Sequence, residues 1–198
     1  MGTLFRIDGP IYNFCLIVYQ LFIINVLWLL FSIPIFTIGA STTALLYTSN
    51  NGVRNKKLNL FSDFWKSFRQ NFFKATFIWL ILGGAFIVVL LNIKYAFEFG
   101  GNFKYFIPLQ AATLIELLIV GFYIFPILAK YKITLKNIFK AAFYIGNKHL
   151  FTTFLCLATL VGCVTMVYYF NFFLLFFMGI YALSVSYFIK RVSKNYFK

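Results

Sequence analysis

Long apolar segments alternate with short basic segments along this chain. A hydrocarbon core about 30 Å thick needs about 20 helical residues, so each long apolar segment predicts a transmembrane helix. The chain is therefore expected to be an all-α membrane protein with about six transmembrane helices, in one integral membrane domain over residues 1–198. The predicted spans cover residues 12–33, 35–48, 72–92, 105–129, 150–169 and 172–189.

The second of these segments, 35–48, is unusually short and follows Pro34, which breaks or kinks the preceding helix. Its first half, Thr37 to Ala44, is almost entirely small or hydroxylated, and small residues let helix backbones approach closely in lipid. It is either a short second span or a re-entrant segment. If it does not cross, five spans remain and the N-terminus is external. Farther along, Gly83 and Gly84 suggest a close-packing point in the third span.

Positive charge separates the two sides of this pattern. All but two of the 18 Lys and Arg residues lie at Arg6, in 54–74, in 130–148 and in 190–198. Basic residues are retained on the cytoplasmic side of a membrane. The distribution therefore predicts that both termini are cytoplasmic, and it favours a crossing by residues 35–48.

Composition supports a membrane protein and excludes several function classes. Hydrophobic residues make up 62% of the chain and charged residues 11%, more apolar than a soluble domain. The net charge of +14 does not indicate nucleic-acid binding, because the cations border apolar spans and form no continuous stripe. Anionic lipid headgroups are the expected partner, at about 1 kcal/mol for each basic residue near the surface. Three cysteines without ligand spacing and the single His149 predict neither a metal site nor a cofactor.

Two of the basic segments also have an apolar face at helical spacing. The apolar positions are Phe61, Phe64, Trp65, Phe68 and Phe72 in the first segment, and Leu135, Ile138, Phe139, Ala142 and Phe143 in the second. Such segments usually lie in the headgroup plane with the apolar face in lipid, which predicts two cytoplasmic amphipathic interfacial helices. The alternative is a docking surface for a cytosolic partner. The candidate docking residues are Phe64, Trp65, Lys66, Phe139 and Lys140.

Glu116 lies near the middle of the fourth predicted span, where an ionised carboxylate is costly. It is either a neutral acid bonded to an Asn, Thr or Tyr of a neighbouring helix, or part of a proton, cation or solute pathway. Together with Thr37, Thr42 and Thr43 it forms the candidate intramembrane polar site. No second acid or base lies at a comparable depth, and Ser-His-Asp, HExxH, Walker A and GxGxxG patterns are absent. The sequence therefore predicts a protein that is not an enzyme.

Several stretches carry a resemblance to a known family. The block Pro-x-x-Thr-x-Gly-x-x-x-Thr-Ala spans residues 34–44, and weaker similarity follows at 63–66, 123–129 and 139–143. In these stretches the chain resembles the YesL-like family of small bacterial membrane proteins, a domain of unknown function. Members often occur beside carbohydrate ABC uptake components in Gram-positive bacteria. The resemblance implies a bacterial cell membrane location and a role in or around sugar import, and it transfers no catalytic or binding residue.

These observations give two functional hypotheses from different classes. The first is a non-enzymatic accessory or regulatory protein of an ABC-type carbohydrate uptake system, whose amphipathic segments contact a permease or ATPase subunit. The alternative is a small stand-alone carrier or channel that acts as a homo-oligomer, with Glu116 in the pathway. A permease half of an ABC transporter is a third option, but the cytoplasmic loops lack a Gly-centred coupling-helix pattern.

Overall fold

The computed structural model describes residues 9–53, 59–99, 105–193 and 196, and this part of the chain consists of helices joined by short links, with no strand. The fold class predicted from the sequence, an all-α protein, is therefore confirmed. In chain order the elements are α1 (Pro10–Ser32), η1 (Ile35–Thr37), α2 (Ile38–Thr48), η2 (Ser49–Val53), α3 (Leu60–Phe99), α4 (Ile107–Lys130), α5 (Leu135–Lys148), α6 (Leu150–Tyr169), η4 (Asn171–Leu175) and α7 (Phe177–Ser193).

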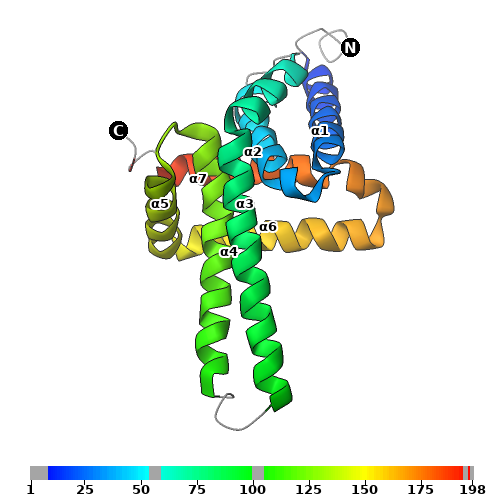
Figure 1. The fold of residues 1–198 in the computed structure, drawn as a ribbon. Helices are drawn as coiled ribbons and strands as arrows, with labels where there is room; N and C mark the ends of the chain where they lie inside the picture. Colours follow the sequence, from blue (N-terminus) through cyan, green and yellow to red (C-terminus); the bar gives the residue numbers. More distant parts are fainter. Residues whose placement is uncertain (1–8, 54–58, 100–104, 194–195, 197–198) are drawn as a thin grey trace.

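A long antiparallel pair of helices, α3 and α4, forms the axis of the molecule (Figure 1). The helices α1, α2 and α7 gather around one half of this pair, and the other half projects away from them. Helix α5 lies alongside α4, whereas α6 runs crosswise to the pair. The packed half therefore holds the hydrophobic core, whereas the side chains of the projecting half are mostly exposed.

Four helices are long and apolar enough to cross a membrane: Ile11–Ser32, Leu60–Glu98, Ile107–Lys130 and Leu150–Tyr169. The expected count of six spans is not confirmed. Helix α2 has 11 residues and α7 has 17, so at 1.5 Å per residue they extend about 16 Å and about 26 Å. The crosswise course of α6 also means that α6 and the α3–α4 pair cannot both follow the normal of one flat bilayer. The cytoplasmic location of both termini stays a prediction.

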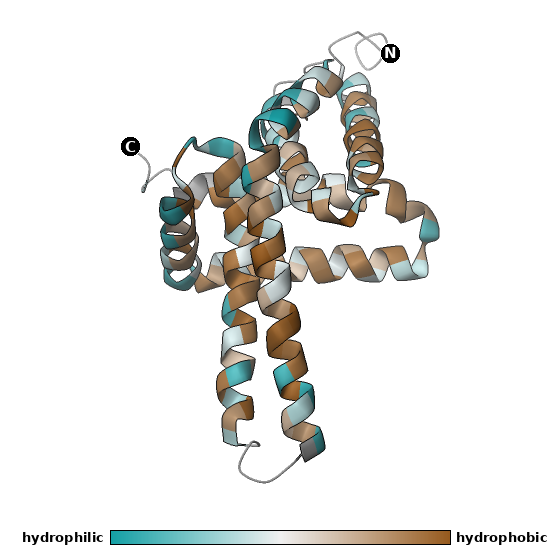
Figure 2. Cartoon of the chain, viewed as in Figure 1, coloured by the Kyte–Doolittle hydropathy of each residue, from teal (hydrophilic) through white to brown (hydrophobic). Residues whose placement is uncertain are grey.

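The first amphipathic segment is the beginning of α3 and not a separate interfacial helix. Helix α3 is 40 residues long, about 60 Å, and runs without interruption from this segment through the predicted span 72–92. Its projecting half is mostly apolar, with polar positions toward the tip (Figure 2). Only 6% of its most apolar window is buried inside the protein, so lipid must cover the remainder.

The second amphipathic segment does form its own helix, α5. This helix lies alongside α4. Asn147 near its end donates a hydrogen bond to Glu116 of α4 at 2.8 Å. A Cβ atom built on Gly146 would lie 2.5 Å from Cγ2 of Ile119, one turn along α4. Protein therefore covers part of the apolar face of α5, while Phe143 on that face is exposed, and the interfacial location of this helix stays a prediction.

Helix α2 is the centre of the core, and a glycine sets its position. A Cβ atom on Gly39 would lie 2.6 Å from the carbonyl oxygen of Ala75 and 2.7 Å from Cβ of Trp79, both in α3. Only glycine permits this approach of two helix backbones. The expected close-packing point at Gly83 and Gly84 is wrong, because a Cβ atom on either would meet nothing within 4 Å.

A buried asparagine joins the first and last helices. Asn25 is fully buried in α1, and its Nδ2 donates to the carbonyl oxygen of Leu174 at 2.9 Å. Its Oδ1 accepts from the backbone N–H of Met178 at 3.2 Å. The side chain thus binds both η4 and the first turn of α7, whose early N–H groups have no partner within the helix. The break between α6 and α7 was predicted at residues 169–171, and α6 ends there at Tyr169.

Candidate functional site

An open cleft of about 470 Å³ lies where the first amphipathic segment meets the link that precedes the second. We call it the basic cleft. The beginning of α3 forms one wall, and the link between α4 and α5 forms the other. The lining residues are Gln70, Asn71, Lys74, Leu128, Tyr131, Lys132, Ile133 and Thr134. The structure thus brings together two segments that lie about sixty residues apart in the sequence.

The link from Tyr131 to Thr134 is extended, and this conformation separates its side chains into two sets. Successive side chains of an extended backbone point to opposite sides. Tyr131 and Ile133 pack against the core, whereas Lys132 and Thr134 are exposed. The Lys130 ammonium lies 4.8 Å from the centre of the Tyr131 ring, a cation–π contact at the end of α4. The link therefore holds Lys132 at the surface of the cleft.

The electrostatic character of the basic cleft is positive. Lys74 and Lys132 are exposed and line it, and Lys66 and Arg69 are exposed on the preceding turns of α3. No Asp, Glu or His is among the lining residues. Surface cations of this kind contribute about 0.2–1 kcal/mol each to an ion pair and raise the association rate with an acidic partner. The arrangement suits binding of an anionic group.

An aromatic cluster fixes the beginning of α3 against the end of α1. The Phe31 ring lies 5.5 Å from that of Phe64, 5.6 Å from Trp65 and 5.0 Å from Phe68, measured between ring centroids. Aromatic pairs at these distances are worth about 0.5–1.5 kcal/mol beyond their buried area. The apolar face of the first amphipathic segment is thus covered largely by α1, which leaves the cations of its other face outward.

The five candidate docking residues differ in accessibility. Phe64 is fully buried in the aromatic cluster, so it cannot contact a partner in this conformation. Trp65 remains 43% exposed, and Lys66 is exposed beside it. On α5, Phe139 packs against the core and Lys140 is exposed. Trp65, Lys66 and Lys140 are therefore the members of the predicted set that present a surface.

The end of α5 carries a small cluster that involves Tyr196. Tyr196 OH and His149 Nε2 are hydrogen bonded at 3.1 Å, and Lys148 Nζ lies 5.5 Å from the centre of each of the Tyr144 and Tyr196 rings. Hydrogen bonding to the Tyr196 and Tyr144 hydroxyls raises the pKa of Lys148, and the charged form is accordingly favoured. Lys148 is a positive charge on the exposed face of α5.

The hydroxyl groups of the segment after Pro34 bind backbone and side-chain atoms of α1 and α2. Thr37 Oγ1 donates to the carbonyl oxygens of Phe31 and Pro34, both at 2.7 Å. Thr43 Oγ1 donates to the Gly39 carbonyl at 2.8 Å, and Thr42 Oγ1 accepts from Trp28 Nε1 at 3.2 Å. These bonds secure the helix break and the α1–α2 contact. The hydroxyls of Thr37 and Thr43, which are buried, act here as structural groups.

Glu116 is only partly buried, and its hydrogen-bond partner lies on α5 and not in the segment after Pro34. The Nδ2 of Asn147 donates to Glu116 Oε1 at 2.8 Å and also to the carbonyl oxygen of Phe143 at 3.1 Å. The partner is thus an Asn of a neighbouring helix, α5. The structure does not join Glu116 to the hydroxyls of Thr37, Thr42 and Thr43 in one hydrogen-bonded network.

A second cleft was not foreseen from the sequence. Its wall is the π-helical turn η2, in which Ser49 and Asn50 follow directly on the apolar helix α2. The only available signal was the polar run Ser-Asn-Asn-Gly after an apolar segment, which is also typical of an ordinary loop. Within the described residues, no three His, Cys, Asp or Glu side chains gather in a way that could hold a metal ion.

Two comparisons relate this chain to known proteins, one over the region of α1, α2 and α3 and the other over most of the chain. Residues 21–93 match the family described as "Protein of unknown function, DUF624". The chain is also 23% identical over 171 residues to the "Uncharacterized protein YesL" of Bacillus subtilis (strain 168). That alignment covers 84% of this chain and 81% of the relative. The resemblance to the YesL-like family is confirmed. No solved structure matches the chain.

The family match includes two of the features described above. It contains the segment after Pro34 with Gly39, and it contains the aromatic cluster and the α3 wall of the basic cleft. Neither the description of the family nor the name of the relative states a function. The YesL-like resemblance therefore supports a membrane protein and leaves its activity to be argued from the sites.

Proposed function

We propose that this chain is a non-enzymatic accessory or regulatory membrane protein that holds an acidic cytosolic partner in the basic cleft. We further propose that the partner is a permease or ATPase subunit of an ABC-type carbohydrate uptake system in a bacterial cell membrane. The observation that carries the proposal is the meeting of the first amphipathic segment and the basic link before α5 at one positively charged cleft. The uptake system is inferred from the YesL-like resemblance.

The packing of the two segments favours a partner over lipid as the main occupant. Their apolar faces are covered in part by α1 and α4, so the fold itself holds Lys74 and Lys132 in place. A preformed cleft reduces the ordering cost of binding a protein surface. Trp65 lies outside the lining of the cleft, but it is half-exposed on the same helix and is an aromatic side chain of the kind enriched at interfaces.

The test is a pull-down of the tagged full chain from native membranes in mild detergent, with co-purifying proteins measured by quantitative mass spectrometry. The double variant Lys74→Glu/Lys132→Glu should lower recovery of the partner about ten-fold, which corresponds to about 1.4 kcal/mol. The control Lys94→Glu makes one such charge reversal, half of the total change, at the far end of α3, where Lys94 faces Glu98 at 3.6 Å. This control should leave recovery unchanged.

The outcomes separate the two parts of the proposal. Equal recovery with the double variant and the wild-type chain would exclude the basic cleft as the docking site. If the co-purifying protein is lost in the double variant and is no permease, ATPase or solute-binding subunit, that result would support the docking role and exclude the uptake system. Recovery should also fall as ionic strength rises, because exposed ion pairs are screened.

The alternative is the small stand-alone carrier or channel, acting as a homo-oligomer. The observation in its favour is the Glu116–Asn147 hydrogen bond, which places a polar pair partway along a helix long enough to cross the bilayer. Solute flux from liposomes that contain only this protein, abolished by Glu116→Gln, would support a carrier. Flux that is unaffected by the substitution would remove Glu116 from the pathway.

A further inference from the structure

The second cleft has a volume of about 390 Å³, within the range of small-molecule sites. It lies between α1, the π-helical turn η2 and α7, and it is separate from the basic cleft. Its lining residues are Ile17, Ser49, Asn50, Val53, Leu183, Ser186 and Tyr187. We call it the polar cleft. We propose that it binds an uncharged amphiphile, a molecule with a hydroxyl-bearing head and an aliphatic body such as diacylglycerol.

The first argument is a buried hydroxyl group. Ser49 is 0% exposed, and its Oγ has no hydrogen-bond partner among the described residues. Most buried polar side-chain atoms in proteins are hydrogen bonded, so such an atom in the wall of a cleft calls for a partner. Ser49 also begins a π-helical turn, a feature that is rare and frequent at functional sites. A hydroxyl or ester oxygen of a ligand would provide the missing bond.

The second argument is the chemistry of the wall. None of the seven lining residues is charged, which indicates an uncharged ligand. Ser49, Asn50, Ser186 and Tyr187 can each donate and accept hydrogen bonds, as a hydroxylated head requires. The remaining three, Ile17, Val53 and Leu183, are aliphatic and suit methylene groups.

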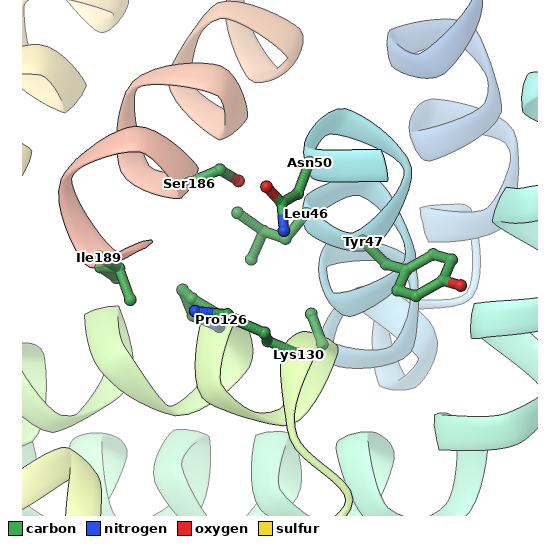
Figure 3. Close-up of a pocket in the computed structure, with 8 residues that line it drawn as sticks. Leu46, Tyr47, Asn50, Pro126, Lys130, Ser186 and Ile189 are labelled. Carbon is green, nitrogen blue, oxygen red and sulfur yellow. The ribbon is translucent and has the colours of Figure 1, made fainter. Parts of the chain in front are cut away.

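A small chamber adjoins the cleft, and its position indicates which end of the cleft holds the hydroxylated head of the ligand. This chamber of about 20 Å³ shares Asn50 and Ser186 with the polar cleft and is closed by Pro126 and Lys130 of α4. In Figure 3 the side chains of Asn50 and Ser186 point toward one another across this chamber. The chamber has room for about one water molecule, so the ligand itself stops at the Asn50–Ser186 pair. Lys130 lies beyond that pair.

Two exposed side chains mark the outer end of the cleft, and one of them belongs to a helix that can cross the bilayer. Ile17 is exposed on α1, and Tyr187, 63% exposed, lines the cleft from α7. A diacylglycerol head would thus reach Ser49 and Asn50, while its acyl chains leave past Ile17 into lipid. A free polyol from water offers the same hydroxyl chemistry without the chains.

The experiment uses the full chain in phosphatidylcholine nanodiscs and a diazirine analogue of 1,2-dioctanoylglycerol, with labelled peptides identified by mass spectrometry. Label is expected on α1, η2 and α7. Ser49→Ala should weaken binding about three- to ten-fold, the effect of one hydrogen bond, without lowering thermal stability. Leu183→Trp should abolish labelling by filling the cleft. Ser184→Ala removes a hydroxyl that donates to the Ile180 carbonyl on the same helix and should leave binding unchanged.

Competition decides the nature and source of the ligand. Displacement by 1,2-dioctanoylglycerol and not by glycerol supports a ligand from the bilayer. Equal displacement by glycerol, which has no aliphatic body, would keep a hydroxyl-binding site and overturn the amphiphile. If dioctanoyl phosphatidic acid displaces the probe ten-fold better, the uncharged class is wrong. Labelling that is the same in Ser49→Ala, Leu183→Trp and the wild-type chain would overturn the proposed site.

Discussion

The close approach of α2 to α3 at Gly39 leads to the sharpest prediction from this fold. Gly39→Ala would place a Cβ atom 2.6 Å from the Ala75 carbonyl oxygen and 2.7 Å from Trp79 Cβ. Neither atom is the end of a flexible side chain, so the two helix backbones must move apart. Overpacking of this kind costs about 1–3 kcal/mol. Because backbone must shift, we take the upper end, about 3 kcal/mol.

Alanine also has a better helix propensity than glycine, which offsets about 1 kcal/mol of this cost. The net destabilisation expected for Gly39→Ala is therefore about 2 kcal/mol. The matched control is Gly84→Ala, in which the new Cβ meets nothing within 4 Å. There only the propensity gain remains, so this variant should be more stable than the wild-type chain by about 0.5–1 kcal/mol.

The two variants are compared by equilibrium unfolding in mixed detergent micelles at increasing SDS fraction, followed by far-ultraviolet circular dichroism. The prediction is a change of opposite sign, with the midpoint lowered for Gly39→Ala and raised for Gly84→Ala. A midpoint for Gly39→Ala equal to or above that of the wild-type chain would refute the α2–α3 contact. A lowered midpoint for Gly84→Ala would show that Gly84 is a close-packing point, as expected from the sequence.

Three further predictions concern the other contacts between helices. Asn25→Leu removes both hydrogen bonds to the start of the last helix and leaves a carbonyl and an N–H unpaired, so the same unfolding assay should show a loss of about 2–4 kcal/mol. Tyr123→Phe breaks only the 3.0 Å bond to Thr153, whose hydroxyl also donates to backbone, and should cost about 1 kcal/mol. In a background without native cysteines, Ile119→Cys and Gly146→Cys should form a disulfide on mild oxidation, because their Cβ atoms are about 4 Å apart or less. Failure to cross-link would mean that α5 lies away from α4.

The long apolar runs could be read from the sequence because their length alone identifies a helix. The segment 150–169 matches α6 at both ends, and 105–129 differs from α4 by two residues at the start and one at the end. A run of twenty apolar residues is a strong signal, and Tyr169 is followed by a break in that run. The YesL-like resemblance was also correct, because it rested on the block after Pro34, which the family match contains.

The continuity of α3 was missed for a physical reason. The charged residues of 61–74 suggested a boundary before the third span, yet no Gly or Pro lies between Leu60 and Leu82 to end a helix. Charges on one face of a helix do not interrupt its backbone hydrogen bonds. The sequence also cannot tell which glycine faces a neighbouring helix, which is why Gly83 and Gly84 were preferred to Gly39.

The same limitation applies to the amphipathic faces, and it bears on function. An apolar face shows only that a helix avoids water, and both lipid and protein satisfy it. Here the Phe31 cluster and the contact at Gly146 provide protein as the cover. The fold then positions Lys74 and Lys132 at one cleft. If the proposed docking role is correct, anionic headgroups and an acidic partner compete for these two cations, and recovery of the partner should fall as the anionic lipid content of the membrane rises.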